Sequence, residues 1–203
     1  MRLNLIDNET DEARMSEISE TERAFLGGGR LHEDRGFKPV NIVVLTISDT
    51  RNEDSDTSGD VLARRVEAAG HVVADRGIVR DDIDAIRAKV MKWVSSGAVD
   101  AIITTGGTGI TGRDVTPEAI EPLLTKRIEG FSTLFHMLSY QTVGLSTLQS
   151  RALAGIIDGV FIFCLPGSNG AVKDGWDKVI RWQLDSRHGP CNMVELMPRL
   201  REK

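Results

Sequence analysis

The segment Val40-Asn-Ile-Val-Val-Leu-Thr-Ile47 constrains the fold more than any other feature of the chain. It is a short, nearly unbroken apolar run rich in β-branched residues, and a polar loop from Ser48 to Thr57 follows it. A strand with one face in water would alternate apolar and polar residues. This run therefore predicts a strand buried on both faces, as in a parallel sheet covered by helices.

The chain from Pro39 onward alternates strand-like and helix-like segments. Further strands are expected at 71–79, 100–104 and 160–165, and helices at 58–69, from 81 into the nineties, at 131–140 and at about 171–182. This alternation predicts a three-layer α/β/α sandwich with a mostly parallel sheet and right-handed crossovers. Expected helix caps are Thr57 or Ser58, Asp81, and Thr116 before Pro117.

Residues 1–38 differ in composition from the rest of the chain. They hold nine acidic and six basic residues, one helix is expected over Ser16 to Phe25, and Gly27-Gly-Gly29 ends it. We interpret 1–38 as a flexible or docking N-terminal arm and 39–203 as one α/β domain.

Charge and composition exclude several classes of protein. The net charge is −5 and no block of Lys and Arg stands out, which argues against nucleic-acid binding. Cys164 and Cys191 form no CxxC pair, and no apolar stretch approaches the ~20 residues of a membrane span. The first residues lack the apolar core of a signal peptide, so a cytoplasmic protein is expected.

Parallel strands place their carboxyl ends at one edge of a sheet, where ligands of open α/β folds bind. Loops 48–57, 105–114 and 166–170 and the turn at 80–82 should meet there. The central loop is Thr104-Thr-Gly-Gly-Thr-Gly-Ile-Thr-Gly-Arg-Asp114. Its glycines allow close backbone approach, and successive amides can hold an anion, so phosphate binding is one interpretation. A tight turn that only packs a helix against a strand is the other.

Two residues separate this loop from the Walker loop. Gly107 and Gly112 have the G-x-x-x-x-G spacing, but Arg113 and Asp114 stand where Lys and Ser or Thr are required. A carboxylate facing phosphates needs a divalent cation between them, so Asp114 suggests Mg²⁺. Alternatively, Asp114 pairs with Arg113 or caps the helix at Thr116.

Other polar residues on this edge have two interpretations each. Asp81 could bind metal or orient a nucleophile, or it could cap a helix whose N-terminus also favours the charge of Asp82. Ser168 and Asn169, in Pro166-Gly-Ser-Asn-Gly170, could hold a ligand at a helix N-terminus or serve as a simple cap. The residues alone thus indicate a Mg²⁺-dependent binder of a phosphorylated small molecule.

The combined motifs resemble the MoaB/Mog family of molybdenum cofactor biosynthesis, which includes the G domains of gephyrin-like proteins. The resemblance covers about residues 39–195, and the tail is similar to the MoaB branch. The motifs that carry it are Thr46-Ile-Ser-Asp49 with Asp56-Thr-Ser-Gly59, Thr104-Thr-Gly-Gly-Thr-Gly109 with Arg113-Asp-Val-Thr-Pro-Glu118, Ser146-Thr-Leu-Gln-Ser-Arg151, Leu165-Pro-Gly-Ser168, and Gln183-Leu-Asp-Ser-Arg187 with Gly189-Pro-Cys-Asn192.

The resemblance implies an α/β/α sandwich that forms homotrimers or homohexamers and works with other molybdenum cofactor assembly proteins. It implies Mg²⁺-dependent adenylylation of molybdopterin by ATP, giving adenylyl-molybdopterin and pyrophosphate. Asp114, which would also hold the metal, and Asp81 are the implied catalytic carboxylates, with Asp81 versus Asp82 left open because Arg80 departs from the Pro often found there. The implied substrate-binding residues are Ser48, Asp49, Thr105, Gly106, Gly107, Thr108, Gly109, Arg113, Pro166, Gly167 and Ser168.

Two alternatives stay open beside adenylyl transfer. One is a molybdopterin-binding scaffold without catalysis, because some members of the branch depart from the Arg-Asp-Val-Thr-Pro pattern. Arg113-Asp-Val-Thr-Pro117 is intact here, which favours catalysis. The other is a different nucleotide-processing enzyme on this fold, such as the domain of CinA-like proteins, against which the Leu-Asp-Ser-Arg tail argues.

Overall fold

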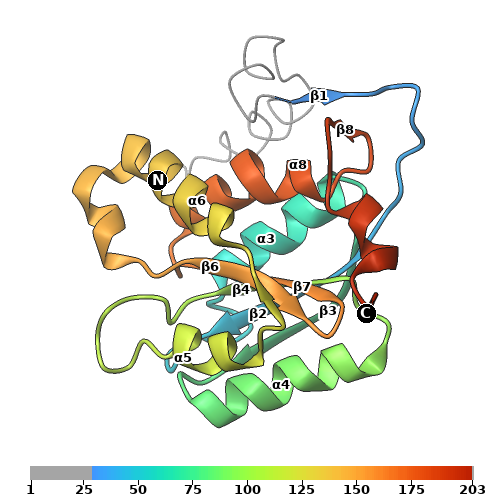
Figure 1. The fold of residues 1–203 in the computed structure, drawn as a ribbon. Helices are drawn as coiled ribbons and strands as arrows, with labels where there is room; N and C mark the ends of the chain where they lie inside the picture. Colours follow the sequence, from blue (N-terminus) through green and yellow to red (C-terminus); the bar gives the residue numbers. More distant parts are fainter. Residues whose placement is uncertain (1–28, 203) are drawn as a thin grey trace, which may run out of the picture.

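The structure is a computed structural model of the 203-residue chain that describes residues 29–202. A six-stranded sheet with the order β3-β2-β4-β7-β6-β5 lies between two layers of helices (Figure 1). This arrangement confirms the predicted α/β/α sandwich. The helix expected over 16–25 lies outside the described residues.

The parallel part of the sheet consists of four strands. These are β2 (Asn41–Ile47), β3 (Val72–Val79), β4 (Ala101–Thr105) and β7 (Val160–Leu165), with β2 paired to β3 and β4, and β4 paired to β7. Helix α3 (Thr57–Ala68) connects β2 to β3, and α4 (Ile83–Ser96) connects β3 to β4. All residues of β2 except Asn41 are buried, as the apolar run predicts.

Two antiparallel strands extend the sheet beyond β7. Strand β6 (Leu153–Ile157) pairs antiparallel with β7, and β5 (Lys126–Arg127) pairs antiparallel with β6. The turn between β6 and β7 is Asp158-Gly159, with φ of 44° and 84°. An Asp-Gly pair with two positive φ angles is a strong hairpin signal. The sequence therefore contains a signal for the β6–β7 hairpin, although β6 is not among the predicted strands.

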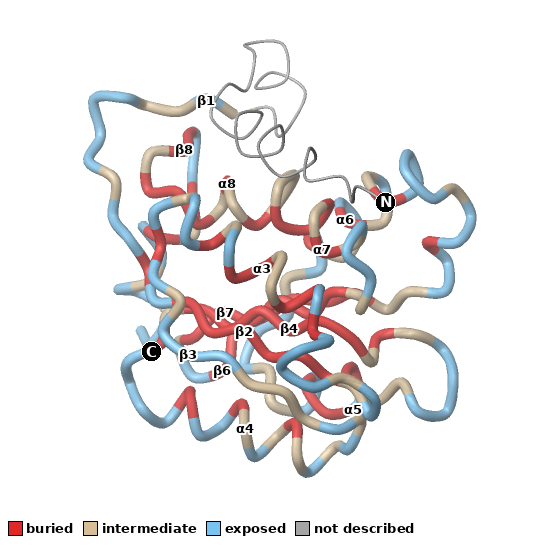
Figure 2. Tube along the Cα trace, turned by 180° about the vertical axis from the view of Figure 1, so that it is seen from behind, coloured by how far each residue is buried: buried red, intermediate tan, exposed pale blue. Residues whose placement is uncertain are grey.

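The sheet has a separate apolar core on each face. One face is covered by α3, by α6 (Glu129–Val143) and by a C-terminal helical segment. This segment consists of α7 (Asn169–Gly175), a π-helical turn at 176–180 and α8 (Arg181–Gln183). Helix α4 and the short α5 (Thr116–Ile120) cover the other. Buried positions in Figure 2 follow the strands and the inner sides of these helices. Alternate residues of β2 serve the two cores, with Val44 in the first and Val43 in the second.

The remaining elements are short. A 3₁₀ turn (Glu121–Leu123) follows α5, a 3₁₀ segment η2 (Gly144–Gln149) follows α6, and another (Val194–Arg199) lies near the C-terminus. Strand β1 (Arg30–Leu31) pairs antiparallel with β8 (His188–Gly189). The described N-terminal residues thus lie against the C-terminal segment. None of the helices within residues 29–202 has the length and apolar character needed to cross a membrane.

Three predicted helix caps are wrong. Asp56, not Thr57 or Ser58, caps α3, because its buried carboxylate accepts a hydrogen bond from the Gly59 amide at 3.0 Å. Asp82, not Asp81, caps α4 by accepting from the Ala85 amide at 2.8 Å. In both cases the chain enters the helix one or two residues away from the predicted position.

The third wrong cap is Thr116. Helix α5 has no side-chain cap, and the Thr116 hydroxyl donates instead to the Gly106 carbonyl at 2.8 Å. This bond ties the start of α5 to the glycine-rich loop.

Candidate functional site

The glycine-rich loop leaves β4 between the ends of its two neighbouring strands. The Gly106 amide donates to the Leu165 carbonyl of β7 at 3.0 Å. Gly106 has a φ of 105°, and a Cβ atom there would lie 2.2 Å from the carbonyl oxygen of Ile47 in β2. Only glycine combines that φ with such close approach. The glycine at 106 is therefore required for the loop to turn between two strands.

Asp49 and Asp81 connect the loop after β2 with the turn after β3. The Asp49 amide donates to the Asp81 carboxylate at 2.9 Å, and the Asp81 amide donates to the Asp49 carboxylate at 3.3 Å. Arg113 reaches across from the glycine-rich loop, and its Nε donates to Asp49 at 3.0 Å. A hydrogen bond from Arg113 holds the pKa of Asp49 below its ordinary value.

The environment of Asp81 has the opposite effect on its carboxyl group. Burial, and secondly the negative charge of Asp49, raise the pKa of Asp81 above its ordinary value. A Cβ atom at Gly107 would lie 3.0 Å from Oδ1 of Asp81, so this carboxylate stands directly against the glycine-rich loop. Because Asp82 caps α4, the Asp81 carboxylate is not used in the cap. A cation beside Asp81 would relieve an unfavourable charge.

Asp114 lies at the far end of the glycine-rich loop and holds its shape. Its Oδ2 accepts from the Thr111 amide at 2.9 Å and from the Thr111 hydroxyl at 2.6 Å. Burial alone would raise the pKa of Asp114, but the hydrogen bonds from Thr111 and the Gly109 amide outweigh it and lower the pKa. Asp114 forms no ion pair with Arg113, whose partner is Asp49, and it does not cap α5.

The loop after β7 packs against the glycine-rich loop from the side opposite β2. The Thr105 hydroxyl donates to the Pro166 carbonyl at 3.1 Å, and a Cβ atom at Gly167 would lie 3.3 Å from Cα of Gly106. Ser168 caps α7 by accepting from the Ala171 amide at 3.2 Å. The simple cap predicted as one alternative for Ser168 is therefore present.

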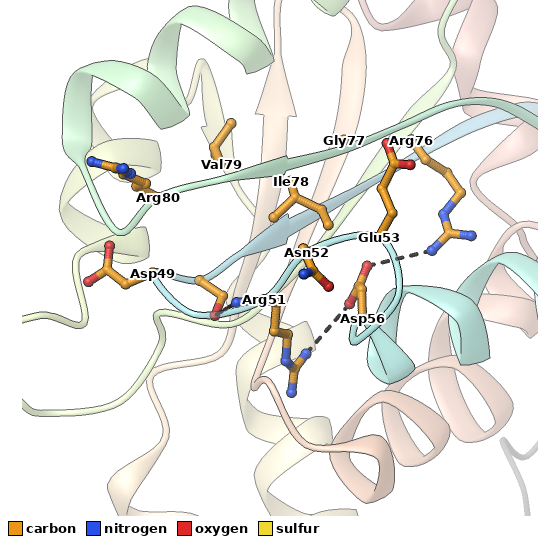
Figure 3. Close-up of a pocket in the computed structure, with 11 residues that line it drawn as sticks. Asp49, Arg51, Asn52, Glu53, Asp56, Arg76, Gly77, Ile78, Val79 and Arg80 are labelled. Carbon is orange, nitrogen blue, oxygen red and sulfur yellow. Dashed lines mark hydrogen bonds and ion pairs between the residues drawn. The ribbon is translucent and has the colours of Figure 1, made fainter.

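A cavity of about 710 Å³ adjoins this edge on the side of β3 (Figure 3). Residues from 48–56 and 76–80 line it, among them Ser48 and Asp49, two of the predicted substrate-binding residues. The edge of the sheet that carries Asp49, Asp81, Arg113 and Asp114 is called the rim below. Arg51 and Arg76 form ion pairs with the buried Asp56 at 3.6 and 3.5 Å. The cavity does not include the glycine-rich loop, so the predicted residues lie beside it and only partly within it.

Two arginines that received no role from the sequence hold the loops together. Arg51 donates to the Gly167 carbonyl at 2.8 Å and to the Ser58 hydroxyl, which joins the loops after β2 and β7. Arg151 donates to the carbonyls of Gly109 and Asp114, both at 2.8 Å, and pairs with Glu118. Its amide also donates to the Thr108 carbonyl at 2.8 Å.

The only sequence signal for these two arginines was indirect. Arg151 ends the Ser146–Arg151 motif, and Arg51 follows Ser48-Asp49. The contacts by which they join distant loops are to backbone carbonyls, of Gly167 for Arg51 and of Gly109 for Arg151. Every residue has a backbone carbonyl, so a sequence motif cannot reveal which carbonyl an arginine will bind.

The rim carboxylates Asp81 and Asp114 could bind a cation whose other ligands are phosphate oxygens and water. Within residues 29–202, no three His, Cys, Asp or Glu side chains lie close enough to form a metal cage. Mg²⁺ does not require one, because it commonly takes one or two carboxylates together with phosphate oxygens and water. Asp81 and Asp114 are carboxylates of this kind, flanking glycine amides suited to phosphate.

Comparisons with known proteins agree on one family. A family model described as a probable molybdopterin binding domain matches residues 43–186. Molybdenum cofactor biosynthesis protein B of Escherichia coli (strain K12) is 46% identical over 156 residues, which are 77% of this chain and 92% of that protein.

Solved structures give the same result. A crystal structure of a molybdenum cofactor biosynthesis protein B has a TM-score of 0.72 at 44% identity, covering 74% of this chain and 94% of that one. The tungsten cofactor synthesizing protein MoaB from Pyrococcus furiosus has a TM-score of 0.63 at 37% identity, covering 69% of this chain and 89% of that one.

Proposed function

The chain belongs to the MoaB/Mog family of molybdopterin-binding proteins of molybdenum cofactor biosynthesis, and on that premise we propose that it adenylylates molybdopterin with ATP and Mg²⁺. The products are adenylyl-molybdopterin and pyrophosphate. The observation that carries this proposal is the Asp81 carboxylate, which is excluded from the α4 cap, has a raised pKa and faces the glycine-rich loop.

The glycine-rich loop is proposed to bind phosphate groups. Residues Thr105 to Gly109 turn with positive φ at Gly106 and Gly107, which supports a nest of amides open to an anion. Thr108 is buried and its carbonyl is held by Arg151, so the backbone of this loop is pre-organised. Ser48, Asp49 and Arg113 on one side and Pro166, Gly167 and Ser168 on the other complete the proposed substrate contacts.

Asp114 and Asp81 are the proposed catalytic carboxylates and the groups that would hold Mg²⁺. When bound, the metal would offset negative charge on the transferring phosphoryl group. The lowered pKa of Asp114 keeps it ionised, as a metal-holding carboxylate must be. Asp81 is preferred over Asp82 as the second carboxylate because Asp82 is committed to capping α4.

In the proposed reaction, an oxygen of the terminal phosphate of molybdopterin forms a bond to the α-phosphorus of ATP. The bond from that phosphorus to the bridging oxygen of the β-phosphate breaks, and pyrophosphate leaves. The chain contributes positioning and electrostatics, which dominate catalysis of phosphoryl-type transfers. Arg113, which donates to Asp49, is proposed to contact a phosphate oxygen.

The proposal is tested by incubating the protein with molybdopterin, ATP and Mg²⁺ and measuring pyrophosphate and the adenylylated product. Turnover that requires all three supports it. Tight binding of molybdopterin without pyrophosphate release would favour the alternative, a non-catalytic molybdopterin-binding scaffold of the same pathway.

The chain is further proposed to form a homotrimer or hexamer and to act with other molybdenum cofactor assembly proteins. One side of α6 and the following segment η2 expose several large apolar residues. The exposed fractions are 57% for Tyr140, 52% for Val143, 71% for Leu145 and 73% for Leu148. Large apolar side chains exposed together on two consecutive elements support self-association.

A further inference from the structure

A second side of α6 forms an apolar groove with the C-terminal helical segment. The groove has a volume of about 450 Å³. Leu134, Met137 and Leu138 of α6 line one wall, and Trp182, His188 and Met193 line the other. Figure 1 shows α6 and α8 on the same face of the sheet, with β8 beyond α8. The groove is distinct from the rim that holds Asp81 and Asp114.

Helix α6 needs more cover than the described residues provide. Phe131 and Phe135 face the core and are almost fully buried. Leu134 and Met137, on the groove side, remain 51% and 61% exposed. Burial of exposed apolar surface is favourable, so the groove offers a docking site to an apolar occupant.

The first described residue lies beside this groove. Gly29 is the first described residue, and a Cβ atom there would lie 2.3 Å from Nε2 of His188, a residue of the groove wall. Leu31 then pairs with His188 in the β1–β8 ladder. Gly29 is therefore held beside the groove by the pairing of β1 with β8.

That segment has the chemistry to fill the groove. Leu26 and Phe25 stand three and four residues before Gly29, so an extended chain places their Cα atoms within about 11 and 14 Å of it. Phe25 is the one aromatic residue among residues 1–28. Gly27, Gly28 and Gly29 separate the pair from β1, and glycine adopts either sign of φ, which allows the chain to reverse direction.

We propose that Phe25 and Leu26 of the same chain dock in the groove between α6 and the 182–193 segment and cover Leu134 and Met137. A short tether gives these side chains a millimolar effective concentration at the groove, which a separate molecule does not have. A second copy of the chain is the competing occupant.

Methionine oxidation tests the docking in the full-length chain. Hydrogen peroxide converts an accessible methionine to its sulfoxide, and mass spectrometry measures the rate at each position. Met137 lies in the groove, whereas Met91, 36% exposed on α4, lies on the opposite face of the sheet and serves as an internal reference. Without a cover, Met137 at 61% exposed should oxidise at least as fast as Met91.

We expect Met137 to oxidise more slowly than Met91 in the unmodified chain. In Leu26→Glu, the Met137 rate should rise roughly tenfold, which corresponds to about 1.4 kcal/mol of docking free energy. The Met91 rate should not change. The matched control is Leu5→Glu, which makes the same substitution in the same segment 24 residues before Gly29 and should leave both rates unchanged.

Three results would overturn the docking. Met137 oxidising as fast as Met91 in the unmodified chain would mean that nothing covers the groove. Protection that survives Leu26→Glu but falls on dilution would assign the groove to a second copy. Protection that survives both changes would assign it to another ligand. None of these results bears on adenylyl transfer, so the two proposals fail independently.

Discussion

Asp49 and Asp81 exchange hydrogen bonds, each carboxylate accepting from the backbone amide of the other, at 2.9 and 3.3 Å. The pair joins the ends of two parallel strands and brings two acidic groups together. Arg113 neutralises Asp49 but leaves Asp81 with a raised pKa.

Replacement of Asp81 should abolish most of the proposed activity, while replacement of its neighbour should not. Asp81→Asn keeps an acceptor for the Asp49 amide but removes the charge proposed to hold Mg²⁺. We expect a loss of at least about 10²-fold in turnover, the size typical of a lost electrostatic contact to a transition state. Asp82→Asn is the matched control, because Asn is also a good N-cap and α4 should stay intact. Equal losses in the two variants would contradict the assignment.

The same substitution should change stability in a pH-dependent way. A folded-state pKa above the unfolded value means that ionised Asp81 opposes folding at neutral pH, and protonation removes this penalty as the pH falls through the raised pKa. Asp81→Asn should therefore have a higher melting temperature than the unmodified chain at pH 7, by about 2–4 °C for each kcal/mol gained in the free energy of unfolding. The difference should shrink toward zero in acid. Thermal unfolding across a pH series measures this difference in melting temperature. A difference that does not depend on pH would contradict the raised pKa of Asp81.

Asp114 should be needed for activity without being needed for folding. Asp114→Ala removes the second carboxylate proposed to hold Mg²⁺, together with the acceptor for Thr111 in an exposed part of the loop. We expect most adenylyl transfer to be lost and the circular dichroism spectrum to be retained. A purified variant with full turnover would rule out a catalytic role for Asp114.

Arg151 should act as a positioning residue for the glycine-rich loop. Arg151→Met removes donors to the Gly109 and Asp114 carbonyls, and Arg151→Lys keeps the charge but not the fork geometry. Both variants should raise hydrogen exchange over residues 106–116 and weaken ATP binding. Arg199→Met breaks only a surface pair with Glu202 and is the control. Unchanged exchange in both Arg151 variants would show that the loop holds its shape without this side chain.

Asp56 should dominate the stability of the loop that follows β2. Its carboxylate, 2% exposed, caps α3, accepts from the Thr46 hydroxyl at 2.6 Å and pairs with Arg51 and Arg76. Asp56→Ala removes the cap and leaves buried donors without an acceptor, so we expect a cost of roughly 2–4 kcal/mol in urea unfolding. The more exposed Asp60→Ala, which also loses a pair with Arg76, should cost under about 1 kcal/mol. A similar cost for both would contradict the role given to Asp56.

The sequence predicted more of the fold than of the site. All four parallel strands were predicted; the buried apolar runs of β2 and β7 and the 3.6-residue period of α4 are local patterns that the sequence records directly. Strand β6 was missed although Asp158-Gly159 signals its hairpin. The predicted loops converge at one edge of the sheet, but the cavity of about 710 Å³ lies beside them and not over the glycine-rich loop.

The amino-acid sequence by itself determined that β2 is buried on both faces, that a glycine-rich loop follows β4, and that two acidic residues follow β3. Only the tertiary structure decided that Asp82 caps α4 while Asp81 faces the glycine-rich loop, and that Arg151 holds the carbonyls of that loop. The physical reason is that a cap depends on the dihedral angles at one junction, and a long side chain finds its acceptors only after distant segments have packed. Residue types and spacing record neither.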